Sequence, residues 1–309
     1  MSDQKNTAEQ FMFDGKCYQP GAVISRSGPS SVRRAVSVDS SLWENVLIRE
    51  WSPFEKQNQR EAPWTTACYK GTIFTGRDTF IRGYQAEAEI YERLSPFADV
   101  KNQLLTFGER SCIIRRFPST VSLQNLLSCL STAIPLKAAL QIAVQLTINL
   151  QSFHRRGLLH LDVSPARVYL LPGKALLLDY HHIWEPGRLP GKEKIPFDSG
   201  YAAPQLLLGN LREVDTTADL YAVCAILFHL LTGRRLRDGE AMNSIFFRNL
   251  PMSIQSRQNL PAATCIETAR LLQKGLYPLA HRRFSSAVQL QQELQQLASQ
   301  SSAQSAVTV

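Results

Sequence analysis

The chain has 309 residues, of which 44% are hydrophobic and 19% charged, a composition typical of a soluble globular protein with one large domain or two lobes. The net charge of +8 comes from arginine doublets that are spread along the chain with no nucleic-acid motif around them, so we expect no nucleic-acid partner. No apolar run reaches membrane-spanning length and the N-terminus lacks the regions of a signal peptide, so we expect no membrane segment. The six scattered cysteines have no C-x-x-C spacing, which predicts a reducing, cytoplasmic location.

The first third of the chain reads mostly as β-strands. Residues 1–10 are polar and are predicted to be disordered, and residues 52–79 are polar with two prolines and are predicted to form an insertion or a long loop. An amphipathic helix is expected from Phe80 to Leu94. Strand-like segments lie at Gly21–Ser25, Val32–Val38, Asn45–Trp51, Gln103–Phe107 and Cys112–Phe117. Residues 11–118 are therefore predicted to form a β-rich lobe with one main helix.

After Ser122 the pattern becomes helical. Two short apolar strands flank a Pro172-Gly173 turn, and 185–200 is rich in glycine and proline, as loops are. Beyond 298 the chain is rich in Ser and Gln, so 298–309 is predicted to be a disordered tail. Helices are predicted at Leu136–Phe153, Asp219–Thr232 with Gly233 as its stop, Thr264–Gly275 and Ala287–Ala298. Residues 119–297 are therefore predicted to form a mostly helical lobe.

Two acidic residues mark the ends of the short strands. Asp162 precedes the first strand and Asp179 closes the second. Phosphoryl transfer uses one carboxylate for the substrate hydroxyl and one for the metal on the phosphates. The pair therefore predicts phosphoryl-transfer chemistry at this point of the chain.

Five motifs in order give residues 16–297 a resemblance to a eukaryotic-type Ser/Thr protein kinase domain of the bacterial kind. The resemblance implies an α+β, bilobal protein-kinase-like fold with a β-rich N-lobe and a mostly helical C-lobe, and it implies ATP and Mg as cofactors. His160-Leu-Asp-Val-Ser-Pro-Ala-Arg167 is similar to the H-R-D-x-x-x-x-N loop, which makes Asp162 the catalytic candidate. The other motifs are Asp179-Tyr-His181 for D-F-G, Gly200-Tyr-Ala-Ala-Pro-Gln205 for G-Y-x-A-P-E, Asp219-Leu-Tyr-Ala-Val223 for D-x-Y-A-L, and Leu276 to Phe284 for D-P-x-x-R-P, with Arg283 matching its arginine.

The nucleotide-binding strand has two candidate registers. Val46-Leu-Ile-Arg-Glu-Trp-Ser-Pro53 resembles the V-A-I-K-E-Y-x-P strand of one bacterial kinase group, which makes Arg49 the replacement for the nucleotide lysine and Glu87 its ion-pair partner. In this register Ser27 and Gly28 fall in the glycine-rich phosphate loop. A rival register reads Ala67-Cys-Tyr-Lys70 as V-A-I-K and would keep a lysine, Lys70, at the nucleotide position.

The residues that handle phosphate depart from the family pattern. Ser25, Ser27 and Ser30 replace the family's loop glycines, and Arg49 is a poor substitute for a compact lysine clamp. Ser164 replaces the lysine that steadies the transferred phosphate. Arg167 replaces the asparagine that holds a second magnesium, so Asp179 either ligates one metal or pairs with Arg167. Losing such electrostatic groups commonly costs about 10²–10³ in rate for each one.

The residues that keep the fold are retained. Asp219 is expected to cap the backbone of the catalytic loop, and His160, Tyr180 and Tyr91 are expected to stack as an internal spine. The leading hypothesis is therefore a pseudokinase that regulates or scaffolds a protein partner, with weak or absent ATP binding. The alternatives are an atypical but active Ser/Thr kinase with one metal and Lys70 as clamp, and a kinase-like fold used for another transfer such as nucleotidylation.

Overall fold

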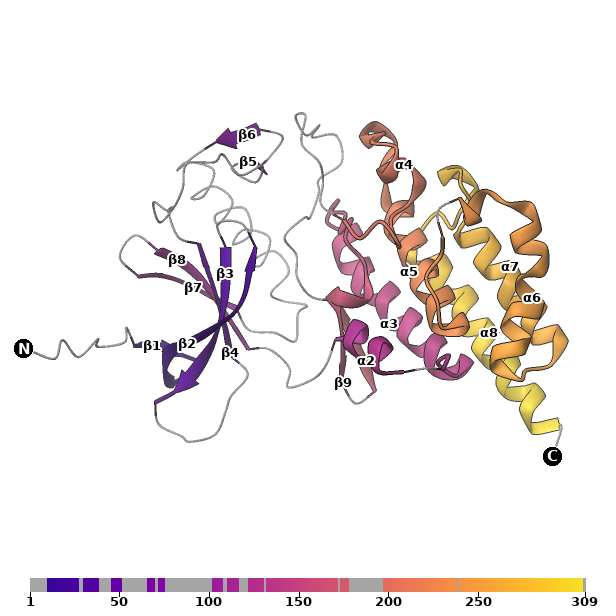
Figure 1. The fold of residues 1–309 in the computed structure, drawn as a ribbon, viewed down its shortest axis with the longest axis horizontal. Helices are drawn as coiled ribbons and strands as arrows, with labels where there is room; N and C mark the ends of the chain where they lie inside the picture. Colours follow the sequence, from indigo (N-terminus) through magenta and orange to yellow (C-terminus); the bar gives the residue numbers. More distant parts are fainter. Residues whose placement is uncertain are drawn as a thin grey trace, which may run out of the picture. The chain divides into compact units, whose positions relative to one another are not determined.

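The computed structural model describes residues 10–27, 30–38, 46–51, 66–69, 72–75, 102–107, 110–116, 122–130, 132–171, 173–177, 197–237 and 239–307. The chain forms two compact units, Met1–Ser119 with Pro190–Glu193 and Thr120–Leu189 with Lys194–Val309. The first unit is built on strands and the second mainly on helices (Figure 1). This mixed content is consistent with a kinase-like fold, while the bilobal arrangement of the two units stays a prediction.

The first unit contains a six-stranded antiparallel sheet with the order β1-β2-β3-β4-β8-β7. All five strands that the sequence predicted before residue 118 are present in it. The strands are β1 (Phe11–Phe13), β2 (Lys16–Ser27), β3 (Ser30–Ser37), β4 (Val46–Trp51), β7 (Asn102–Phe107) and β8 (Arg110–Arg116). In β4, alternate residues from Val46 to Glu50 are buried, as expected when one face of a strand lies against a core.

Strand β1 and β2 form a tight hairpin that completes this core. Asp14 and Gly15 both have positive φ, 52° and 76°, as a two-residue type I′ turn requires, and Asp-Gly is a favoured pair there. Phe11 stacks on Tyr18 across the hairpin with ring centroids 5.8 Å apart. The hairpin therefore adds aromatic burial to a cluster made of Phe11, Phe13, Tyr18, Ala35, Val46, Ile48, Cys112 and Ile114.

The segment predicted as an insertion carries a small sheet of its own. Strands β5 (Thr66–Tyr69) and β6 (Thr72–Thr75) pair antiparallel. The predicted helix from Phe80 to Leu94 lies outside the described residues. So do the predicted disordered residues 1–9.

The second unit contains the four helices predicted from periodicity and several further ones. The predicted helices correspond to α3, α5, α7 and α8, whereas α6 was not predicted. The elements are α2 (Leu123–Cys129), α3 (Leu136–His154), η2 (Pro165–Arg167), β9 (Val168–Leu171), β10 (Lys174–Leu177), α4 (Pro204–Leu207), η3 (Leu211–Glu213), α5 (Thr216–Thr232), η4 (Glu240–Met242), α6 (Ser244–Gln258), α7 (Ala262–Gly275), η5 (Ala280–Arg282) and α8 (Ala287–Val307).

Helix α5 forms the centre of the second unit. Asp215 caps its N-terminus by accepting from the Thr217 N–H at 2.9 Å, and Gly233 ends it in the left-handed conformation with φ 70°. Every residue from Thr217 to Thr232 is buried, because α5 packs against α3, α6 and α7. A helix that is apolar all round belongs inside a protein.

The side chain of Asn149 connects helix α3 to strand β10, the partner of β9. The Asn149 amide donates to the Ala175 carbonyl at 3.1 Å and its carbonyl oxygen accepts from the Leu177 N–H at 3.3 Å. Gly173 supplies the positive φ, 72°, that their connecting turn requires. The hairpin that follows the catalytic-loop motif is therefore fixed to the helical core.

The last helix runs further than the sequence indicated. Helix α8 continues through Val307, whereas the polar composition predicted a disordered tail from residue 298. Its first half packs on α3 and α7, with Leu290, Leu294 and Leu297 buried. Within the described part of the chain, no helix combines the length and the apolar character needed to cross a membrane.

Candidate functional site

Asp162 lies in the segment that connects helix α3 to η2. The preceding residue, Leu161, has a φ of 58°, which is unusual for a residue with a side chain. Such a left-handed backbone costs on the order of 1–3 kcal/mol and persists only when the surroundings hold it. Here the backbone N–H groups of His160 and Leu161 both donate to one buried carboxylate, that of Asp219.

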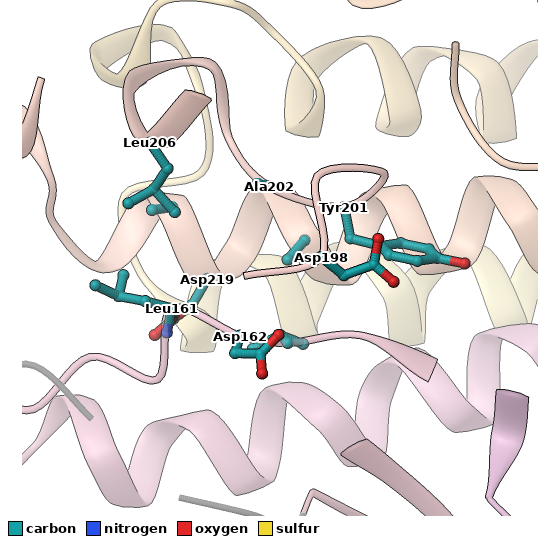
Figure 2. Close-up of a pocket in the computed structure, with 10 residues that line it drawn as sticks. Leu161, Asp162, Asp198, Tyr201, Ala202, Leu206 and Asp219 are labelled. Carbon is teal, nitrogen blue, oxygen red and sulfur yellow. Dashed lines mark hydrogen bonds between the residues drawn. The ribbon is translucent and has the colours of Figure 1, made fainter. Parts of the chain in front are cut away.

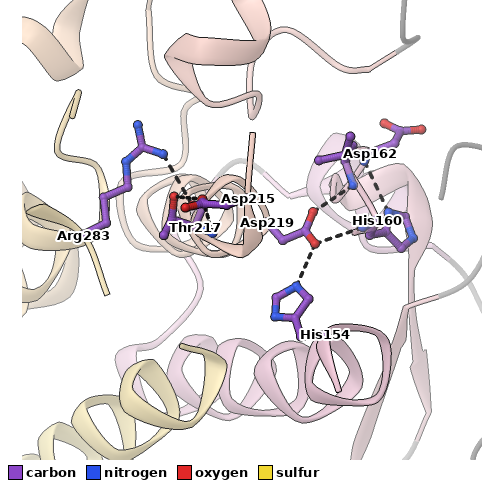
Figure 3. A network of polar contacts seen from close by, with 8 residues as sticks. His154, His160, Asp162, Asp215, Thr217, Asp219 and Arg283 are labelled. Atoms are coloured by element: carbon purple, nitrogen blue, oxygen red, sulfur yellow. Dashed lines mark hydrogen bonds and ion pairs between the residues drawn. The ribbon is translucent and has the colours of Figure 1, made fainter. Parts of the chain in front are cut away.

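Asp219 organises the network shown in Figure 3. Its two oxygens accept from His160 N at 2.9 Å, Leu161 N at 2.8 Å and the His154 ring at 2.8 Å. Burial alone would raise the pKa of Asp219, but the hydrogen bond and charge of His154, with those of His160, hold it below its ordinary value. The carboxylate is therefore ionised and fixes the backbone just before Asp162, as the sequence predicted.

Asp162 and Arg167 form an ion pair within the catalytic-loop motif. Arg167 Nε donates to Asp162 Oδ2 at 2.8 Å, and the side chains are 28% and 5% exposed. The short helix η2 makes this contact, because it turns the chain back so that its last residue reaches a side chain five positions earlier. The sequence left open whether Arg167 pairs with Asp179, which lies outside the described residues.

Ser164 stands where the resemblance places the phosphate-steadying lysine. It is buried, 2% exposed, and forms the N-cap position of η2. Its carbonyl accepts from the Arg167 N–H at 2.9 Å. Ser164 thus shapes the turn that brings Arg167 to Asp162.

A small cavity lies beside this loop, in the second unit (Figure 2). It offers about 10 Å³ to the centre of a water-sized sphere, enough for roughly one water molecule. Its walls are Leu161, Asp162 and Val163 from the loop, Asp198, Tyr201 and Ala202 from the segment that leads into α4, Leu206 from α4 itself, and Ala218, Asp219 and Ala222 from α5. Leu161, which replaces an arginine of the family pattern, is one of these wall residues.

The segment before α4 is anchored by a cluster that the sequence did not reveal. The Tyr201 hydroxyl lies 2.7 Å from His229 Nδ1, and the Arg235 guanidinium lies over the Tyr201 ring, 5.2 Å from its centroid. Arg235 also pairs with Asp198 at 3.4 Å. Burial, with the charge of Arg235, lowers the pKa of His229, which favours its neutral form. The only sequence signal was the Gly200-to-Gln205 motif, because His229 and Arg235 are distant in the chain.

Gln205 and Arg283 join α4 to the segment before α8. Arg283 is 5% exposed and donates to Gln205 Oε1 at 3.1 Å, and to the carbonyls of Tyr277 and Pro278 at 2.6 and 2.7 Å. Burial lowers the pKa of Arg283 to about 10, so it stays charged at neutral pH. Gln205 replaces the glutamate of the family pattern, and its Nε2 has no hydrogen-bond partner within the described residues.

The residues predicted to bind the nucleotide lie on the first unit or outside the described ranges. Arg49 is on β4, opposite Val32 of β3 and Ile113 of β8, and Ser27 ends β2 opposite Ser30. Gly28, Lys70, Glu87 and Asp179 are outside the described residues. Strand β4 neighbours the β2–β3 hairpin, whereas Thr66–Tyr69 is placed in a separate sheet. Both the Arg49 register and the Lys70 register stay predictions.

The described residues do not fit a second magnesium at the catalytic loop. Arg167 places a cation on the Asp162 carboxylate, and a cation cannot act as a metal ligand. Within the described ranges, no group of three or more His, Cys, Asp or Glu residues could hold a metal ion.

No protein-family model matches the chain. A segment of 88 residues, 26% of the chain, is 40% identical to the serine/threonine-protein kinase PknF of Mycobacterium tuberculosis and covers 18% of that protein. A segment of 141 residues, 43% of the chain, is 28% identical to the serine/threonine-protein kinase pkn2 of Myxococcus xanthus and covers 16% of it. A segment of 176 residues, 52% of the chain, is 28% identical to the serine/threonine-protein kinase PksC of Streptomyces coelicolor and covers 30% of it.

These relatives are Ser/Thr protein kinases, and the matched segments span between 16% and 30% of their lengths. The similarity extends over as much as half of this chain. Together with the mixed helix and strand content, this similarity supports the interpretation that the chain is protein-kinase-like.

Proposed function

We propose that this chain is a pseudokinase, a kinase-like protein that acts by binding a protein partner and has weak or absent ATP binding. The observation that carries the proposal is the 2.8 Å ion pair between Arg167 Nε and Asp162 Oδ2. In phosphoryl transfer this carboxylate has to receive the substrate hydroxyl. A guanidinium bound to it competes with that hydroxyl and places a positive charge where the family pattern has a neutral metal ligand.

The surroundings of the pair support the same proposal. Asp162 is almost fully buried, so Arg167 serves as a counter-ion for a carboxylate that has lost most of its hydration. The neighbouring Ser164 is buried in the turn and has no charge to offer a phosphate. The fold-keeping contacts of Asp219 remain, so the loop keeps its shape while the charges within it differ.

A thermal-shift titration with Mg-ATP tests the nucleotide-binding part of the proposal. With a dissociation constant in the millimolar range, 1 mM Mg-ATP raises the melting temperature by less than about 2 °C. A rise of more than about 4 °C that disappears with EDTA would contradict weak or absent binding.

Intact-mass analysis after incubation with Mg-ATP separates the alternatives. An unchanged mass is the expected result. A gain of one phosphate that is lost in Lys70→Ala would favour the atypical kinase, which the retained Asp162 and its anchored loop make the second candidate. A gain of one nucleotide would favour nucleotidylation.

A further inference from the structure

Helix α6 carries apolar side chains on the face that does not pack. Ile245 and Met252 are 59% and 72% exposed, and Met242, just before the helix, is 62% exposed. Ile245 and Met252 are seven residues apart, about two helical turns, and so they share one face of α6. Single exposed apolar residues are ordinary, whereas several on neighbouring positions indicate an interaction site.

The fold of α6 does not depend on this outer face. Phe247, Leu250 and Ile254 are buried on the opposite side, against the core of the second unit. The C-terminal end of the helix is fixed by Gln258, whose amide donates to the carbonyls of Ile134 and Leu231 at 2.9 and 3.0 Å. The outer residues can therefore be changed without opening the core.

The charge of the outer face is positive. Arg248 lies between Ile245 and Met252 on the exposed side, and no ion pair to it is present among the described residues. Helix α6 contains Arg248 and Arg257 but no Asp or Glu. The nearby carboxylate of Glu240 is already engaged by Arg234 at 2.8 Å.

We propose that Met242, Ile245, Arg248 and Met252, named here the α6 surface, bind an amphipathic acidic segment of another protein. Methionine side chains adapt to varied apolar partners, and a carboxylate on the partner would complement Arg248.

A second copy of this chain is disfavoured, because a symmetric α6–α6 contact would bring arginine against arginine. A lipid surface is disfavoured, because anionic membranes are recognised by clusters of about four to eight basic residues. The proposal rests on the protein-binding role proposed above, for which it names a surface and the chemistry of the partner, and it does not depend on the absence of catalysis.

Selection of a displayed library of 16-residue peptides against the full chain tests the proposal. The enriched peptides are expected to combine apolar residues with Asp or Glu, and their affinity to fall as salt rises. Met252→Asp and Arg248→Glu are each expected to raise the dissociation constant of an enriched synthetic peptide by roughly tenfold or more, as measured by fluorescence anisotropy.

Two control variants keep the test specific. Arg257→Glu makes the same charge change on α6, but nine residues from Arg248, about two and a half turns, and so on another face. Ile266→Asp makes an apolar-to-acidic change at an exposed position of α7. Both are expected to bind the peptide like the wild type, and melting curves check that every variant is folded.

The proposal is overturned if no peptide is enriched, if the enriched peptides are basic or uncharged, or if the surface variants bind like the controls. It is also overturned if light scattering finds a dimer that Met252→Asp dissociates, or if the chain binds phosphatidylserine vesicles through Arg248 while no acidic peptide is enriched. A phosphotransfer assay on the same variants measures catalysis independently of peptide binding. The peptide-binding proposal and the proposed lack of catalysis can therefore fail separately.

Discussion

At the scale of single residues, the candidate site is defined by the hydrogen-bond and ion-pair partners of its polar side chains. Asp219 accepts hydrogen bonds from two backbone N–H groups and a histidine, and the sequence motif predicted this capping of the loop backbone. Asp162 forms an ion pair with Arg167, a contact that the sequence did not predict, because the motifs pointed only to Asp179 as a partner for Arg167. Gln205 meets Arg283, so a buried guanidinium is bonded to an amide where the family pattern has a carboxylate. Two of these three contacts thus involve a replaced residue.

Replacing Arg167 tests the energetic value of its ion pair. Arg167→Asn removes the counter-ion of a buried carboxylate, and we expect the free energy of unfolding to fall by about 1–2 kcal/mol, since Arg167 is itself partly exposed. Urea denaturation measures the change. The control is Arg270→Asn, which breaks the exposed pair with Glu267 and is expected to cost about 0–0.5 kcal/mol. Equal losses in the two variants would contradict the assigned role.

Restoring a carboxylate at position 205 is expected to stabilise the protein. Gln205→Glu removes a buried amide nitrogen without a partner within the described residues and gives the buried Arg283 an opposite charge. We expect a gain of about 1–2 kcal/mol at pH 7. The new carboxyl has a depressed pKa when folded, so the gain is complete above its unfolded pKa of about 4.3 and is lost as the pH falls below it.

Urea denaturation of Gln205→Glu at pH 7 and pH 3 measures this gain. Gln295→Glu, on the exposed side of α8, makes the same change without a buried partner and is expected to alter stability by less than about 0.5 kcal/mol. A loss of stability in Gln205→Glu at pH 7 would show that the cost of burying the carboxylate exceeds its attraction to Arg283.

At the scale of helices and strands, the sequence predicted the elements whose hydrophobic residues recur at regular intervals. Alternate residues of strand β4 are buried, and helix α5 is buried from Thr217 to Thr232, so the hydrophobic patterns of these two elements are simple. Helix α6 was missed because it carries Pro251 and apolar residues on its outer face, which blur the helical period. Helix α8 was predicted too short because its Ser/Gln-rich end lacks an apolar stripe.

The packing of α5 against α7 depends on a close approach at one glycine. A Cβ added at Gly275 would collide with the Cys224 Sγ and would lie 2.9 Å from the Cys224 Cβ. Gly275→Ala is therefore expected to cost about 1–3 kcal/mol of stability, measured by urea denaturation. Adding Cys224→Ala removes the colliding sulfur, and the double variant is expected to recover part of the loss. Strict additivity of the two changes would contradict this contact.

At the scale of the whole molecule, the candidate residues are divided between two units. Asp162, Arg167 and Ser164 belong to the second unit, and Arg49 and Ser27 to the first. The sequence predicted both sets from motif order. It could not predict the partner of Arg167, because that contact depends on the turn of η2, which no periodicity encodes.

The second unit is expected to fold without the first. Among the described residues, its hydrophobic cluster runs from Leu123 to Leu297 within that unit. A fragment of residues 120–309 is therefore expected to show a helical circular-dichroism spectrum and a cooperative thermal transition. The fragment 1–119, whose described core has eight residues, is expected to unfold at a lower temperature. A non-cooperative melt of the 120–309 fragment would contradict this expectation.

Transfer of labelled γ-phosphate from Mg-ATP is the measurement that tests the proposed pseudokinase function most directly. The wild type and Asp162→Ala are incubated with labelled ATP and a general protein substrate, and the incorporated label is counted. Because Arg167 is bonded to the Asp162 carboxylate, we expect both proteins to give the same background incorporation. Incorporation by the wild type that is at least about a hundredfold above that of Asp162→Ala would contradict the account, since a working catalytic group contributes on the order of 10²–10⁴ in rate.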